Sequence, residues 1–93
     1  MLNFEGYSIP TNLEEGLVNY VKHGLMPGGF LYALLCNDLF AAIGSADPWS
    51  MQALKELVIW VYNEAPADCW GSEAVVSRYM KKQSEISAKS IAQ

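Results

Sequence analysis

The chain has 93 residues, a net charge of −4 at neutral pH and a hydrophobic content of 52%. This length allows one small domain with a modest core, and the many aromatic residues and few charges exclude a disordered chain. Direct binding to DNA or RNA is disfavoured, because the six basic residues are scattered rather than clustered.

The two cysteines, Cys36 and Cys69, and the single histidine, His23, do not make a zinc-binding pattern, so we expect no metal and no cofactor. The start of the sequence lacks the basic and apolar regions of a secretory signal. We therefore expect a cytoplasmic protein with both thiols free. No apolar run approaches the ~20 residues that a membrane-spanning helix needs.

Residues 1–10 are predicted to form an arm that packs onto the helices through its apolar side chains, Phe4, Tyr7 and Ile9. The first helix follows. Thr11-Asn12-Leu13-Glu14 has the capping-box pattern, which places Thr11 at the N-cap and Glu14 at the third helical position. Apolar residues then recur at helical spacing, and Gly24 is predicted to end the helix.

The segment Pro27-Gly28-Gly29 predicts a turn, and the second helix is expected over residues 30–43. Its residues are apolar on most sides, so we expect it to be the central and most buried helix. Asn37 and Asp38 are its strongly polar interior residues. Gly44-Ser45 is expected to end it.

Asp47-Pro48 predicts the start of the third helix, because Asp is a strong N-cap and Pro is favoured in the first helical position. Pro66 is expected to end it near residue 64. The apolar spacing predicts a core stripe made of Met51, Leu54, Leu57, Val58 and Val61. Ile59 then falls on the outer face and Trp60 on its border, and with Trp49 they are candidate contacts with a partner or a second copy.

Ser72 is predicted to cap a fourth helix that carries Val75, Val76, Tyr79 and Met80. The sequence therefore predicts an all-α protein, a compact bundle of four main helices with short Gly/Pro loops. One helical domain is expected over residues 1–83, with the arm at 1–10. Residues 84–93 are expected to be either a helical extension or a disordered tail.

Gly28 and Gly29 precede a helix start that lacks a capping side chain. Free backbone N–H groups at a helix start favour an anion, and Phe30 would lie beside it, so these three residues are candidate ligand contacts. The simpler alternative is a tight turn that needs a positive φ, with Phe30 as a core side chain. No Lys follows the glycines, so the segment is not a P-loop.

Cys69-Trp70-Gly71-Ser72 is the second candidate, because a loop Trp can stack on a planar ligand ahead of another helix start. If the two segments are close in space, two helix starts converge on one anion. Asn37 and Asp38 offer hydrogen bonds to the same kind of ligand. Each has a structural alternative: Trp70 covers the core, and the polar pair holds a turn. Cys69 has no evident general base, so we expect no catalysis.

Four sequence blocks occur in an order that resembles a group of small uncharacterised helical proteins encoded by phages and prophages. The blocks are Met26-Pro27-Gly28-Gly29-Phe30-Leu31, Asn37-Asp38-Leu39, Tyr62-Asn63-Glu64-Ala65-Pro66 and Cys69-Trp70-Gly71-Ser72. The resemblance covers residues 26–79. It implies a phage accessory protein in the host cytoplasm, and such proteins often counter host defence.

Two binding functions are consistent with that expectation. In the first, the glycine segments and Trp70 sequester a nucleotide-like immune signal without catalysis. In the second, exposed aromatic side chains bind a host defence protein complex, as an anti-CRISPR-like inhibitor or adaptor would. The high aromatic content for this length also makes a homo-oligomer an expected state.

Overall fold

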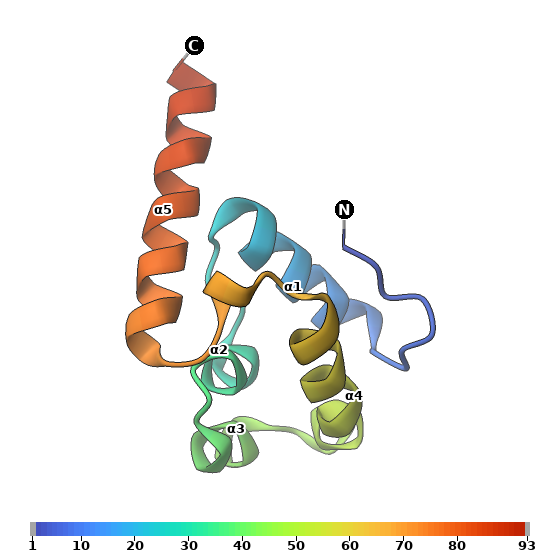
Figure 1. Cartoon of the computed structure of the whole chain (residues 1–93). Coiled ribbons are helices and arrows are strands. Elements are labelled where there is room, and N and C mark those ends of the chain that lie inside the picture. The colour runs from blue at the N-terminus through green and yellow to red at the C-terminus, as the bar shows by residue number, and fades with distance from the viewer. Residues whose placement is uncertain (1, 93) are drawn as a thin grey trace.

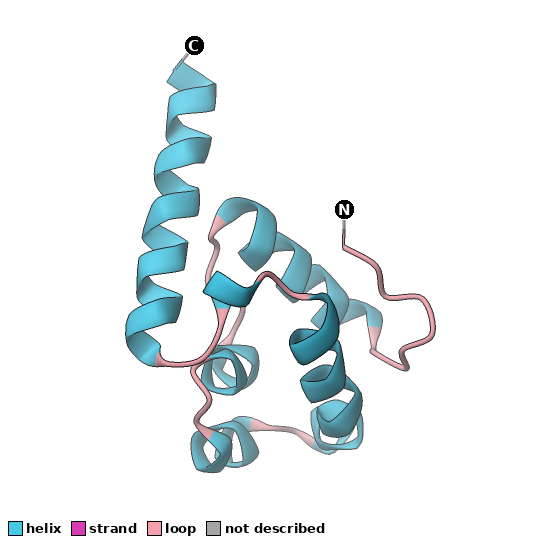
Figure 2. Cartoon of the chain, viewed as in Figure 1, coloured by secondary structure: helices cyan, strands magenta, loops and turns pink. Residues whose placement is uncertain are grey.

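Helices account for all the regular structure in residues 2–92, which are the residues that the computed structural model describes, with side chains described for residues 2–86. The predicted all-α class with short connections is confirmed (Figures 1 and 2). In chain order the elements are α1 (Thr11–His23), α2 (Gly29–Leu35), α3 (Leu39–Ser45), α4 (Pro48–Glu64), the 3₁₀ helix η1 (Ala67–Cys69) and α5 (Glu73–Ala92).

Helix α1 ends as predicted but begins differently. Gly24 has φ 69°, and its N–H donates to the carbonyl oxygen of Tyr20 at 2.9 Å, which is the left-handed helix end that glycine favours. The predicted capping box is wrong. Pro10 is the N-cap without a side-chain cap bond, and its carbonyl oxygen accepts from the N–H groups of Leu13 and Glu14. Thr11 therefore lies inside the helix.

The second predicted helix is two short helices, α2 and α3, and the prediction of one continuous helix over residues 30–43 is wrong. Asn37 has φ 62°, a left-handed conformation that Asn adopts more readily than other residues with a side chain. Its N–H donates to Leu34 and that of Asp38 donates to Ala33, which closes α2 in a Schellman motif. The Asp38 carboxylate then accepts from the N–H of Ala41 at 3.1 Å and caps α3.

Helix α4 begins where Asp47-Pro48 predicts, because the Asp47 carboxylate accepts from the N–H of Ser50 at 2.7 Å. Its buried face is rotated from the predicted one and consists of Ser50, Ala53, Leu57, Trp60 and Val61. Met51 and Val58, predicted in the core, are exposed. The placement of Trp60 on the border of the outer face is wrong: its side chain is 0% exposed.

The N-terminal arm explains why Trp60 is buried. The ring of Phe4 stacks on Trp60 with 4.6 Å between centroids, and the indole N–H donates to the carbonyl oxygen of Asn3 at 2.7 Å. Ile9 joins the core and Tyr7 packs against it, so the predicted packing of the arm is confirmed. The N-terminal arm thus covers a side of α4 that the apolar spacing of α4 alone predicts to be exposed.

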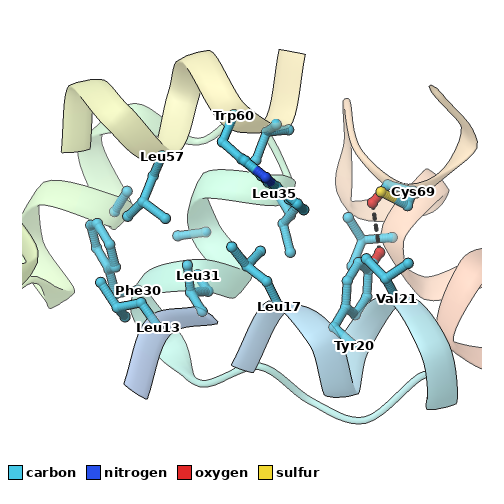
Figure 3. Packing of buried hydrophobic residues seen from close by; sticks show 14 of the residues in the cluster. Leu13, Leu17, Tyr20, Val21, Phe30, Leu31, Leu35, Leu57, Trp60 and Cys69 are labelled. Carbon is cyan, nitrogen blue, oxygen red and sulfur yellow. Dashed lines mark hydrogen bonds between the residues drawn. The ribbon is translucent and has the colours of Figure 1, made fainter. Parts of the chain in front are cut away.

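The core lies where α1, α2 and α4 meet, and Figure 3 shows its side chains in contact. The fully buried side chains include Leu17, Leu31, Leu35, Leu57 and Trp60. Burial of one such side chain stabilises the fold by roughly 1.5–3 kcal/mol. Tyr20 closes the core beside Cys69, and its hydroxyl donates to the Cys69 carbonyl oxygen at 2.6 Å (Figure 3).

Helix α5 begins after Ser72, whose hydroxyl accepts from the N–H of Val75 at 3.2 Å, as predicted. The hydroxyl of Tyr79 and the side-chain amide of Gln83 both donate to the carbonyl oxygen of Val21, which joins α5 to α1. The helix continues to Ala92, so residues 84–92 form the helical extension, and Gln93 lies outside the described residues. Its C-terminal half projects beyond the other helices in Figure 1.

Candidate functional site

The first glycine segment forms an uncapped start of α2. Gly28 is the N-cap with φ 93°, and no side chain makes a cap bond there. Phe30 points into the core and is 8% exposed. The nearest atoms to a Cβ built on Gly29 belong to Ser45, so this helix start faces the end of α3. The segment has the conformation of the tight turn that was the simpler alternative.

The second glycine segment lies at the other end of α2. The N–H of Gly71 donates to the carbonyl oxygen of Leu35 at 2.8 Å, and Leu35 is the last residue of that helix. Seven helical residues separate the ends of α2 by about 10 Å. The two segments therefore do not converge on one ligand within the chain. The Ser72 hydroxyl also caps α5, because it accepts a hydrogen bond from the N–H of Val75.

Asn37 and Asp38 shape the turn between α2 and α3, as described above. Both are exposed, and they border a shallow groove of about 70 Å³ with Leu39, Leu54 and Val58. Hydrogen bonding of these two residues to a ligand stays a prediction. Their observed contacts are the ones that hold the turn and cap α3.

Six of the exposed large apolar side chains belong to α3 and α4, and we name them together the α3–α4 face: Leu39, Phe40, Ile43, Met51, Val58 and Tyr62. Leu39 and Val58 line the same groove, which joins the two helices. Met51 and Tyr62 lie seven residues before and four residues after Val58, so they share its side of α4. Phe40 is 88% exposed and Tyr62 is 74% exposed.

Of the three residues predicted to contact a partner, two are exposed and one is buried. Trp49 is 72% exposed and Ile59 lies on the outer surface of α4, whereas Trp60 is enclosed by the arm. Sequence reasoning missed Leu39, Phe40 and Ile43, because it placed them on a continuous buried helix. The signal that could have found them is Asn37-Asp38, a pair that favours a left-handed helix end followed by a new N-cap.

The buried ionisable groups are held in their neutral forms. Burial raises the pKa of the Cys69 thiol to about 12, with a further contribution from the nearby Asp68 carboxylate. Burial likewise raises the pKa of Tyr79 to about 12 and raises that of Tyr20. A protonated, enclosed thiol is a poor nucleophile, so Cys69 is a core residue.

Within the described part of the chain, no group of three or more His, Cys, Asp or Glu side chains is placed to hold a metal ion. None of the described helices combines the length and the apolar character that are required to cross a membrane.

Two of the hollows that are larger than the groove between α3 and α4 lie beside α1 and α5. One, of about 500 Å³, lies between the arm and α1 and includes Phe4, Glu14 and Lys22. The other, of about 250 Å³, lies between η1 and α5 and includes Trp70 and Arg78. Of these two hollows, the one between η1 and α5 contains a residue predicted to bind a ligand, Trp70.

Comparison with known proteins assigns neither a family nor a function to the chain. No protein-family model matches the chain, and neither the curated proteins nor the solved structures include a match.

Proposed function

We propose that the protein acts by binding another protein through the α3–α4 face. The observation that carries the proposal is the exposure of the aromatic side chains Phe40 and Tyr62, together with Leu39 and Val58, which line one groove between α3 and α4. Contiguous apolar patches are uncommon on proteins that act alone. Aromatic side chains are also the residues that contribute most to protein–protein binding energy.

The negative charge of the segment that contains this face favours a partner with a basic surface. Residues 38–64 contain four acidic residues and one basic residue, Lys55, a net charge of −3. Asp38 and Asp47 lie at the starts of α3 and α4, and Asp38 lines the groove with Leu39 and Val58. A complementary partner surface has an apolar centre bordered by Lys and Arg.

The resemblance to phage-encoded proteins makes a host defence complex the expected partner. This proposal favours protein binding over sequestration of a nucleotide-like signal by both glycine segments, because those segments lie at opposite ends of α2. A second copy of the chain is the competing occupant of the face. The experiment must therefore distinguish homo-oligomerisation from binding to a host protein.

Site-specific photo-crosslinking in bacterial host cells tests the proposal. A photoreactive phenylalanine replaces Phe40, Tyr62 or, as the control, Ile86, an exposed apolar residue on α5. We expect one heterologous protein to be crosslinked at positions 40 and 62 and not at 86. Crosslinking to a second copy alone, or to no protein at either position, would contradict the proposal.

The crosslinked protein is then purified and its binding measured directly. Phe40→Asp is expected to weaken binding by at least about tenfold, because an exposed hot-spot aromatic is replaced by a charge. Ile86→Asp is the matched control and is expected to leave affinity unchanged. Association is also expected to slow as salt is added, because opposite charges that border the two surfaces are screened.

A further inference from the structure

The hollow between η1 and α5 is built by one face of a helix and the loop that precedes it. Val75, Arg78 and Lys82 recur at helical spacing, so they lie on the same side of α5. Trp70 and Asp68 form the opposite wall. The hollow has a volume of about 250 Å³. An aromatic ring and two cationic side chains therefore border one small pocket.

The charge of this pocket differs from that of the chain. Residues 65–93 are the net positive part of an otherwise acidic sequence, with four basic and three acidic residues. Lys82 lies 3.7 Å from Asp68, and both side chains are more than half exposed, so the pair is weak. Within the described residues Arg78 makes no ion pair. Its planar guanidinium can make two parallel hydrogen bonds to a phosphate group.

The indole N–H of Trp70 is a second observation that points to a ligand. It is the one buried side-chain polar atom in the described residues that has no hydrogen-bond partner. A buried Trp N–H usually finds an acceptor, and an unmade hydrogen bond is costly. Trp70 lines the pocket together with two cationic side chains and one carboxylate, a net charge of +1 that favours an anionic acceptor.

We infer that this pocket binds a small phosphorylated ligand with a planar ring, such as a mononucleotide. The phosphate lies against Arg78 and Lys82, and the planar ring lies against the indole of Trp70. The pocket is smaller than those that enclose a drug-sized ligand, so part of the ligand stays in solvent. The pocket adjoins the α3–α4 face, because the rings of Trp70 and Tyr62 lie 6.3 Å apart, but Phe40 does not line it. The site needs neither Gly28 nor Gly29.

Calorimetric titration of the full chain with AMP tests the inference, with adenosine and inorganic phosphate as partial ligands. AMP is expected to bind more tightly than either, because it has both the phosphate and the ring. Arg78→Ala and Lys82→Ala are each expected to weaken AMP binding by about tenfold or more, the loss typical of one charged hydrogen bond. Lys81→Ala is the matched control, since Lys81 is an exposed basic residue on the same helix that does not line the pocket.

Three results would overturn the inference. One is no binding of AMP at millimolar concentration. Another is an equal loss for Lys81→Ala and Lys82→Ala, which would indicate diffuse attraction to a basic helix. The third is equal affinity for AMP and adenosine. Arg78 and Lys82 are exposed, so their variants are expected to fold. Phe40→Asp should leave AMP affinity unchanged, which separates a failure here from a failure of the protein-binding proposal.

Discussion

The hydroxyl of Tyr20 on α1 lies 2.6 Å from the carbonyl oxygen of Cys69, just ahead of α5. This hydrogen bond joins segments that are 49 residues apart in the sequence and closes one end of the core. A second tyrosine, Tyr79, makes the reciprocal connection from α5 to the carbonyl oxygen of Val21 on α1. The two rings lie 5.3 Å apart, so the helices are held together by a pair of buried phenols.

These two tyrosines give the first prediction. Tyr20→Phe is expected to lower the free energy of unfolding by about 1–3 kcal/mol, because it leaves a buried carbonyl without this donor. Tyr79→Phe is expected to cost less, since the Val21 carbonyl also accepts from Gln83. Urea unfolding measures both values. An equal loss in the two variants would show that Gln83 does not compensate.

The second prediction concerns Gly24, where the end of α1 meets α5. A Cβ at this position would lie 2.5 Å from the carbonyl oxygen of Met80, and φ is already left-handed. Gly24→Ala is expected to lose at least about 1–2 kcal/mol from the backbone conformation, with the steric clash in addition. Thermal unfolding is the measurement.

Gly44→Ala is the matched control for this substitution. Gly44 lies within α3, and a Cβ there would meet nothing within 4 Å. The alanine is expected to raise the free energy of unfolding by up to about 1 kcal/mol, because it reduces the freedom of the unfolded chain. Opposite shifts of the melting temperature are therefore expected, and a loss at both positions would contradict the structural distinction.

The third prediction is a loss of stability at alkaline pH under reducing conditions. The Cys69 thiol has a pKa of about 12 in the folded protein, whereas a thiol in an unfolded chain titrates near ~8.5. Above that lower value the unfolded state releases a proton that the folded state retains. The free energy of unfolding is therefore expected to fall as pH rises from about 8.5 towards 12.

Urea unfolding between pH 8 and 9 isolates this effect, because unfolded tyrosines titrate only near ~10. Cys69→Ala is expected to flatten the decline in this range. Cys36→Ala is the comparison: burial also raises the pKa of Cys36, but that side chain is only partly buried, so its variant should flatten the decline less. A decline unchanged in Cys69→Ala would assign the pH dependence to other groups.

The elements that sequence reasoning placed correctly are those whose ends depend on nearby residues. Asp47, Ser72 and Gly24 each act through hydrogen bonds within a few positions, so their types and spacing were sufficient. The split between α2 and α3 is also local. It was missed because the apolar residues on either side of Asn37 continue at a spacing compatible with one helix.

The burial of Trp60 and the candidate surfaces depended on contacts between distant parts of the chain. Trp60 is buried because Asn3 and Phe4 cover it, and no periodicity within α4 contains that information. The candidate surfaces follow the same rule. Trp70 could be selected from its own loop, whereas the pairing of that residue with Arg78 and Lys82 required the fold.

The hydrogen bonds to the Val21 carbonyl also set the order in which the chain can mature during synthesis. Their donors, Tyr79 and Gln83, follow Val21 by 58 and 62 residues. At bacterial or eukaryotic translation speeds, that separation corresponds to about 3–12 seconds. Throughout this interval the apolar stripe of α1 is without its final cover. The nascent chain is thus expected to complete its core only after nearly all of it has been translated, and prematurely terminated chains should be substrates for chaperones and proteases.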